Sequence, residues 1–264
     1  MVTSVTRQVV LAIAAHPDDI EFLMAGTMVL LGRAGHELHY LNLTNGCCGS
    51  TEQDAATIAA VRKDEARRAA ESIGAEFHES ICNDLEIFYD QATLAQVASI
   101  IRLVKPTIVL THSPADYMED HMNACRLAVT AAFSRGMPNF PVEPPREAFN
   151  DPLTLYHAQP YSHMDPLGQL VVPHCFVNVE PVAEQKWAML SCHQSQKQWL
   201  DESQGLDSYL QTMRDLDMQL GTMSGSFQAA EGWRRHLHLG FCGADDDPLV
   251  DSLLDHVMRA EVVG

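Results

Sequence analysis

The sequence predicts an α/β fold with a Rossmann-like, mostly parallel sheet, helices on both faces of that sheet, and a C-terminal extension over the candidate site. Three observations support this prediction. Short apolar runs alternate with helical segments through the first half of the chain. The runs are continuously apolar, as is typical of parallel strands buried on both faces. Polar clusters follow the runs, where ligands bind in open α/β sheets.

The first half alternates regularly between strand and helix patterns. Gly35 and Gly74 each end a helical pattern, where glycine commonly accepts a left-handed conformation. Thr44, Asn45 and Gly46 end the second strand. In chain order, the expected strands and helices are Val9–Ala15, Ile20–Arg33, Leu38–Leu43, Ala55–Ser72, Leu94–Leu103, Thr107–Thr111 and Ala124–Phe133.

The second half begins with an irregular stretch. Five prolines between Arg135 and Pro152 exclude regular structure over most of that segment. Further elements are expected after it: two short strands, a helix, and an apolar stripe at helical spacing that predicts a core helix. These are Leu153–His157, His174–Val179, Val182–Ser191 and Leu206–Leu220, and the run Asp245–Asp247 is expected in a solvated loop.

Length and composition exclude several classes of protein. The 264 residues, 46% hydrophobic and 20% charged, suit a single globular domain over 1–264. The net charge of −18 disfavours nucleic acid and anionic membranes as partners. No apolar run reaches the roughly 20 residues of a membrane-spanning helix. The seven cysteines form no Cys-x-x-Cys pair, so we expect reduced thiols and a cytoplasmic protein.

Two polar clusters predict a metal site. His16, Asp18 and Asp19 follow the first strand, and a second cluster, His112–His121, follows the strand Thr107–Thr111. The topology brings both to one edge of the sheet. Two imidazoles and one carboxylate form a ligand set of catalytic zinc, and the adjacent Asp18 would then lie beside the metal as a base. The alternative is a helix N-cap at Pro-Asp-Asp with His16 packed in the core.

The chain resembles the LmbE / PIG-L family of zinc-dependent de-N-acetylases. The resemblance begins with the segment Ala14–Glu21, which contains His-Pro-Asp-Asp, and extends over nearly the whole chain. The other matching segments, in the same order as in the family, are Leu43–Gly46, Arg62–Ala66 with Gly74 after it, Asn83-Asp84, Asp116–His121 and His193–Gln196.

This resemblance implies a role for each matching residue. It implies zinc, or another divalent transition metal, held by a three-residue ligand set. It implies a general base next to a ligand, two residues that face the substrate or brace the site, and a carboxylate that orients a ligand or a side chain near the substrate. The implied ligands are His16, Asp19 and His121, and the implied general base is Asp18. Arg62 and Asp84 would face the substrate or brace the site, and Asp120 would be the orienting carboxylate. The implied reaction removes an N-acetyl group from an amino sugar or a related small molecule, and many members of the family are homo-oligomers.

One position departs from the family pattern. Many members carry a second histidine three residues before the ligand histidine, where it helps to stabilise the oxyanion. This chain has Met118 there, which cannot donate a hydrogen bond. Tyr117, His163 and His193 are the candidate replacements, whereas the place of His112 at the end of a strand favours a packing role.

Two other functions remain to be separated from this one. An Asp-Asp pair after the first strand also describes a phospho-receiver domain, but that reading leaves His16 and His121 unexplained. A non-catalytic module that binds metal and sugar is the other alternative. Zinc with nitrogen ligands, rather than magnesium with oxygen ligands, excludes the receiver, and turnover excludes the binding module.

Overall fold

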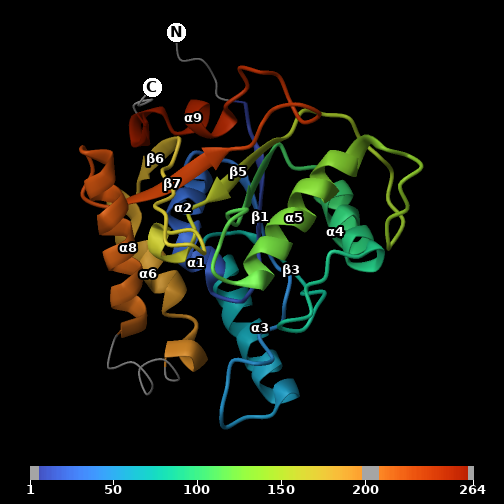
Figure 1. Ribbon diagram of the computed structural model, residues 1–264, viewed down its shortest axis with the longest axis horizontal. Helices are drawn as coiled ribbons and strands as arrows, with labels where there is room; N and C mark the ends of the chain where they lie inside the picture. The colour runs from blue at the N-terminus through green and yellow to red at the C-terminus, as the bar shows by residue number, and fades with distance from the viewer. Residues whose placement is uncertain (1–5, 198–207, 261–264) are drawn as a thin grey trace.

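The computed structural model describes residues 6–197 and 208–260, and these form an α/β structure built on one sheet (Figure 1). The eight described strands have the order β3-β2-β1-β4-β5-β7-β6-β8. The first five are parallel, and the last three pair antiparallel. Their bounds are β1 Val9–Ala14, β2 Glu37–Asn42, β3 Glu76–His78, β4 Ile108–Thr111, β5 Thr154–Ala158, β6 Cys175–Asn178, β7 Ala230–Arg235 and β8 Val257–Arg259.

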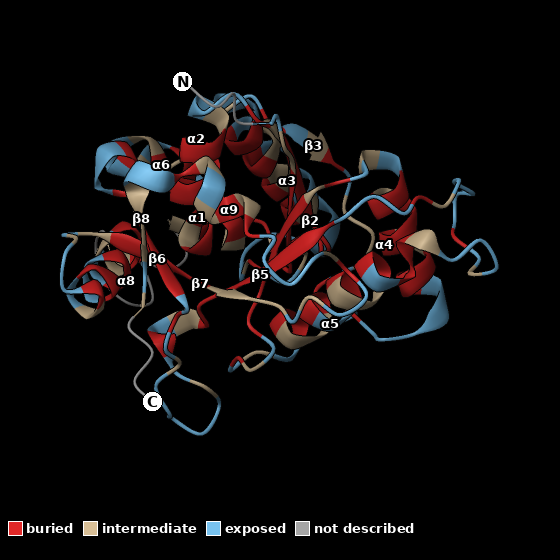
Figure 2. Cartoon of the chain, turned by 90° about the horizontal axis from the view of Figure 1, so that it is seen from above, coloured by how far each residue is buried: buried red, intermediate tan, exposed pale blue. Residues whose placement is uncertain are grey.

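Helices cover both faces of the sheet, and the buried core lies between them and the strands (Figure 2). One apolar cluster joins the sheet to α1, α2, α3 and α6, and a second joins its other face to α4 and α5. The helices are α1 Asp19–Leu23, α2 Ala25–Arg33, α3 Ala55–Ser72, α4 Gln91–Val104, α5 Glu119–Phe133, α6 Ala183–Leu190, α8 Ser208–Ser224 and α9 Pro248–Ser252. Helix α8 packs on β6 and β7.

The helix expected over Ile20–Arg33 is two helices. The chain turns at Met24, with φ −138° and ψ −18°, and α2 starts at the next residue. The cause lies far along the chain, because the carboxylate of Glu231 in β7 accepts the N–H groups of Gly26 and Thr27 at 2.8 Å each. A carboxylate at a helix N-terminus satisfies free N–H groups and complements the helix dipole.

A buried charge cluster secures the C-terminal elements to this helix. The Lys186 ammonium of α6 is fully buried, and it lies 2.7 Å from Asp217 of α8 and 2.8 Å from Glu231. Breaking such a cluster on one side leaves an unpaired charge in the core, at a cost of about 3–5 kcal/mol. The cluster therefore ties α2, α6, α8 and β7 into one unit.

The proline-rich segment has little regular structure, as expected, apart from a single 3-10 turn over Ser134–Gly136. The buried Arg102 of α4 fixes its path, because its guanidinium donates to the carbonyl groups of Ser134, Met137, Phe140 and Arg146. The carbonyl groups of this irregular backbone thus find their partners in a helix of the core.

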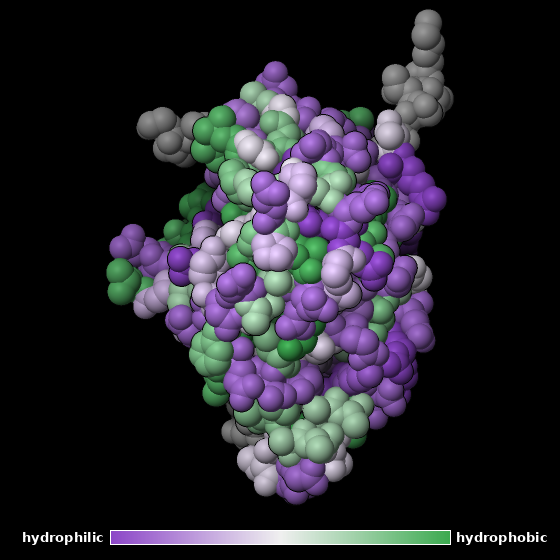
Figure 3. Space-filling model, turned by 90° about the vertical axis from the view of Figure 1, so that its right-hand side faces the viewer, coloured by the Kyte–Doolittle hydropathy of each residue, from purple (hydrophilic) through white to green (hydrophobic). Residues whose placement is uncertain are grey.

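One face of the molecule is mostly polar (Figure 3). Figure 3 shows a face on which hydrophilic residues predominate and hydrophobic residues form small, separate groups. None of the helices in the described ranges is both long and apolar enough to cross a membrane.

Candidate metal centre and cavity

The candidate site lies at the carboxyl edge of the parallel strands. His16 and Asp18 follow β1, and Asp19 opens α1. His112 follows β4, and His121 lies in the first turn of α5. Strands β1 and β4 are hydrogen-bonded neighbours, so the two polar clusters meet as the topology predicted.

Three of these side chains converge on one point. Ligand atoms of His16, Asp19 and His121 all lie within 4.8 Å of one another. His16 Nδ1 is 3.3 Å from Asp19 Oδ2, and His121 Nε2 is 3.3 Å from Asp19 Oδ1. The structure thus brings together the three residues that the resemblance implied as ligands.

Each of the two imidazoles is held from behind by a carboxylate. Asp116 Oδ1 lies 2.9 Å from His121 Nδ1, and Asp120 Oδ2 lies 3.1 Å from His16 Nε2. A carboxylate on one ring nitrogen fixes the tautomer and leaves the lone pair of the other nitrogen free for a metal. In both rings, that other nitrogen faces Asp19.

The buried carboxylates give the centre a negative potential. Burial lowers the pKa of His121, but Asp19 and Asp116 outweigh burial and raise that pKa to about 10. Burial acts on His16 in the same way, and Asp120 and Asp19 raise its pKa to about 9. Although burial opposes it, the pKa of Asp19 is lowered well below its usual value by His121 and His112. The centre therefore attracts cations, either protons or a metal ion.

These pKa values predict that metal binding releases protons. At pH 7 both imidazoles of the metal-free centre carry a proton, and each must lose it to become a ligand. We expect about two protons to be released per ion at pH 7, fewer as the pH approaches 9–10, and weaker metal affinity as the pH falls. Zinc titration calorimetry in buffers of different ionisation enthalpy measures this number. Heats independent of the buffer at pH 7 would contradict the prediction.

Asp18 lies beside the centre in an unusual backbone conformation. Its φ of 116° is rare for a residue with a side chain, and such conformations collect at functional sites. Tyr209 Oη donates to Asp18 Oδ2 at 2.8 Å, and Arg62 Nη2 lies 3.4 Å from the same oxygen. Burial raises the pKa of the Asp18 carboxyl; Arg62 opposes this shift, and Asp19 adds to it.

Arg62 and Asp84 are both tied to the glycine loop after β2. Arg62 of α3 is buried and also donates to the carbonyl of Pro17. Asp84 accepts the N–H groups of Gly46 and Cys48 at 2.8 Å each. Gly46 has φ +75°, and a Cβ there would lie 2.5 Å from Arg62 Cδ. The loop therefore needs glycine at this position, because the arginine packs directly against its backbone.

A cavity of about 690 Å³ opens onto the centre, and we call it the site cavity. Arg62 and Asp84 line it, whereas Asp120 does not and instead contacts His16 and the N–H of Leu85. Part of the cavity wall is aromatic: Phe22 lies 6.0 Å from Tyr161 and 5.1 Å from Tyr209 between ring centroids, and Tyr117 lies 5.8 Å from Tyr161. The volume is in the range of small-molecule sites.

Of the three candidate oxyanion donors, only Tyr117 is among the described residues that line the site cavity. Its ring centroid lies 5.7 Å from that of His121. His163 Nε2 lies 3.1 Å from the carbonyl of Leu216, and His193 is fully buried beside Glu21. The ring of His112 stacks 4.2 Å from that of His121, and its Nε2 accepts the N–H of Ala15. The same Nε2 lies 3.3 Å from Asp19 Oδ2, so His112 also faces the centre.

The sequence reasoning gave no role in the site to Asp116 or Tyr209. Asp116 stands five residues before His121, in the motif itself, and its full burial is the feature that a sequence does not display. Tyr209 belongs to the apolar stripe that predicted a core helix. The stripe is buried in α8, but the hydroxyl at its N-terminal end reaches Asp18. Leu206, also of that stripe, lies outside the described residues.

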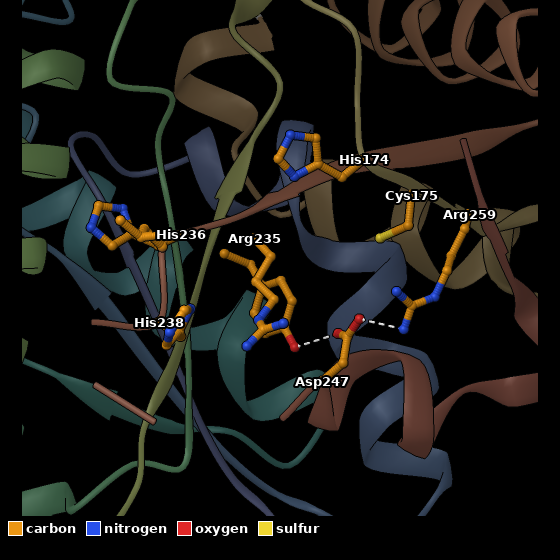
Figure 4. A pocket seen from close by; sticks show the side chains of 9 residues that line it. His174, Cys175, Arg235, His236, His238, Asp247 and Arg259 are labelled. Carbon is orange, nitrogen blue, oxygen red and sulfur yellow. Dashed lines mark hydrogen bonds and ion pairs between the residues drawn. The ribbon is translucent and has the colours of Figure 1, made fainter. Parts of the chain in front are cut away.

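A second cavity, of about 270 Å³, shares no described residue with the site cavity (Figure 4). Asp247 finds its partners within this cavity: Tyr156 Oη donates to Asp247 Oδ1 at 2.7 Å, and Arg259 donates to Oδ2 at 2.8 Å. Asp247 is therefore buried, and the prediction of a solvated loop is wrong for this residue, because two distant strands supply its partners.

Comparison with known proteins places these features in a family. A family model described as PIG-L, GlcNAc-PI de-N-acetylase, matches residues 11–133. The diacetylchitobiose deacetylase of Thermococcus kodakarensis is 31% identical over 85% of this chain and 82% of its own length. The 4-oxalmesaconate hydratase of Pseudomonas putida is 27% identical over 71% of this chain and 73% of its own length. The N,N'-diacetylchitobiose deacetylase structure from Pyrococcus horikoshii superposes with a TM-score of 0.74 at 23% identity, covering 87% of this chain and 84% of that one.

Proposed function

Because this chain belongs to the PIG-L family of de-N-acetylases, we propose that it is a zinc-dependent hydrolase that removes the N-acetyl group of a small amino sugar. The single observation that carries the proposal is the convergence of His16, Asp19 and His121 beside the carboxylate of Asp18. A divalent metal ligand set with a base next to it is suited to hydrolysis of an amide.

The donor set fits zinc. Two imidazole nitrogens and one carboxylate oxygen leave a position open, as catalytic zinc sites do. Each imidazole has a carboxylate on its other nitrogen, which is the arrangement that orients histidine ligands in such sites. Zinc bound there would act as a Lewis acid toward the substrate carbonyl and lower the pKa of water.

The residues of the chain then divide the work of proton transfer. Asp18 accepts a proton from the attacking water, and its raised pKa suits a group that must hold that proton during the reaction. Tyr209 and Arg62 both contact Asp18 Oδ2 and orient the carboxylate. Asp18 next gives the proton to the nitrogen of the breaking C–N bond, so that one amide and one water yield acetate and an amine.

The cavity lining supports a neutral, hydroxyl-rich substrate. The row of rings from Tyr117 through Tyr161 to Phe22 offers aromatic surface against which the apolar face of a sugar ring can pack. Asp84 and Gln196 lie among the lining residues and supply polar groups that fix orientation.

Hydration of a carbon–carbon double bond is the second candidate, and the hydratase relative from Pseudomonas putida is the observation that favours it. Both reactions need an activated water and a base. Substrates with the several carboxylates that this relative's name implies would need several cations. The described part of the cavity lining contains one arginine, Arg62, and no lysine, together with three aspartates. We therefore prefer the neutral amino sugar.

An assay of products separates the two reactions. The zinc-loaded protein is incubated with N-acetylglucosamine, N,N'-diacetylchitobiose and other N-acetyl amino sugars, and the free amine and acetate are measured. Equal amounts of both products support the proposal. A protein that releases neither, but consumes a conjugated tricarboxylate with loss of its ultraviolet absorbance, would be a hydratase.

Tyr117 is expected to stabilise the oxyanion in place of the histidine that Met118 replaces. The variant Tyr117→Phe removes the hydroxyl and keeps the ring, and losing one such donor lowers kcat about 10²- to 10³-fold. Zinc content and KM should stay near those of the wild type. His163→Gln is the matched control, because His163 bonds to a backbone carbonyl and does not line the described cavity. Equal kcat values for Tyr117→Phe and the wild type would assign the oxyanion to another group.

A further inference from the structure

A second group of metal-ligating side chains lies at the edge of the sheet, away from the lining of the site cavity. The sequence carries the same pattern twice, Glu37-Leu38-His39 and Glu76-Phe77-His78. These segments form parts of β2 and β3, which are parallel neighbours with His39 paired to Glu76. Side chains two residues apart in a strand share a face, so both glutamates and both histidines lie on one face of the strand pair.

Three donor atoms of this group converge. His39 Nδ1 lies 3.0 Å from His78 Nε2 and 3.8 Å from Glu76 Oε2, and the ligand atoms of the three residues lie within 4.8 Å of one another. Bonds of 2.0–2.1 Å to a tetrahedral zinc ion separate neighbouring ligand atoms by about 3.3 Å. The two measured distances lie on either side of that value, so small side-chain rotations suffice to admit an ion.

The fourth residue of the pattern prepares His39 for coordination. Glu37 Oε1 lies 3.1 Å from His39 Nε2, and Arg7 holds the other oxygen of Glu37 at 3.1 Å. This carboxylate fixes the proton on Nε2, so the lone pair of Nδ1 points to His78. In the metal-free protein, the Nε2 proton of His78 fills the gap between the rings, and a divalent ion would replace that proton.

Burial and access also suit a metal ion. His39 and His78 are 5% and 9% exposed, so their rings are held in place, whereas the side chain of Glu76 is 66% exposed and leaves a path for entry. We propose that His39, Glu76 and His78 form a second binding site for a borderline divalent ion such as zinc. It is separate from the centre formed by His16, Asp19 and His121, which we call the hydrolytic centre. The ion would fasten the three-residue edge strand β3 to β2.

Counting bound ions tests this site without reference to the activity. The full chain is stripped with a chelator, loaded with zinc, passed through a desalting column and analysed for metal. We expect two ions per wild-type chain and one in His78→Gln. Glu76→Gln, which changes an exposed residue and should fold normally, should bind the second ion at least about tenfold more weakly. Cobalt titration followed by visible absorption should show the same two steps.

Matched variants identify which ion is lost. Glu79→Gln removes an adjacent carboxylate that pairs with Lys63 and Arg67 instead, and it should retain two ions. In a His121→Ala background one ion should remain, and adding His78→Gln should remove it. A wild-type protein that holds a single ion, or a His78→Gln variant that keeps two, would overturn the proposal. Neither result would bear on the hydrolytic function, because His78 does not line the site cavity.

Discussion

Asp18→Asn is expected to fold, to keep its zinc, to bind substrate, and to lose about 10²- to 10⁴-fold in kcat. Asparagine has nearly the same shape and keeps an oxygen that can accept the Tyr209 hydroxyl, but it cannot take a proton from water near neutral pH. The loss should fall on kcat, with KM close to that of the wild type. Steady-state kinetics at matched zinc content measure both parameters.

The comparison with Asp19→Asn makes this test specific. The carboxylate oxygens of Asp19 lie 3.3 Å from His16 Nδ1 and from His121 Nε2. The main effect of Asp19→Asn should therefore be a loss of metal affinity. If Asp18→Asn loses zinc and Asp19→Asn keeps it, the two roles are exchanged. If Asp18→Asn keeps both zinc and near-normal turnover, the base is another residue and the mechanism is wrong.

His121→Ala is expected to remove the ion of the hydrolytic centre and all measurable turnover. It deletes one of three ligands and leaves Asp116, fully buried, without its imidazole partner. Removing even an outer carboxylate from such a site costs about 10- to 100-fold in affinity, so loss of a ligand should exceed that range. Metal analysis and the acetate assay on the same preparation measure the two effects.

Two further variants separate the loss of the ligand from a loss of folding. His121→Gln keeps a side chain in the buried position, and circular dichroism shows whether either variant is unfolded. His174→Gln changes a histidine that lines the smaller cavity and should leave zinc and turnover unchanged. Full zinc content with full activity in His121→Ala would show that the histidine of the second motif is not a ligand.

Local signals predicted the parallel half of the fold. Apolar runs mark β1 and β4 because these strands are covered on both faces, and β2 was predicted from a run that His39 and Asn42 interrupt. Helix α3 was predicted with its observed bounds, Ala55–Ser72. Strands β3, β7 and β8 were not predicted. β3 and β8 are three residues long, and β7 carries Glu231 and Arg234, whose partners come from distant parts of the chain.

The site, too, combines residues that local patterns indicate with contacts between distant parts of the chain. The motif residues His16, Asp18, Asp19 and His121 follow strand ends, so the topology alone brings them together. What the sequence could not display is contact across long separations. Tyr209 meets Asp18 across 191 positions, and the Ser195 hydroxyl donates to Glu65 across 130. Such contacts depend on how the C-terminal part packs against the sheet, which no local pattern encodes.

The origin of the cavity walls also bears on how such enzymes diversify. The candidate ligands and the candidate base all belong to the segment 11–133 that the family model matches, whereas Tyr161, Gln196, Tyr209 and Thr212 come from beyond it. The candidate ligands and base thus come from one part of the chain, whereas the cavity wall draws on both parts, with Phe22, Asp84 and Tyr117 before residue 133 and these four residues after it. Insertions or recombination after residue 133 can reshape that part of the cavity wall while the candidate ligands and the candidate base stay unchanged. Chimaeras joined at that point would measure how much of the specificity the later part of the chain carries, provided that each incoming half brings its own partner for Asp18.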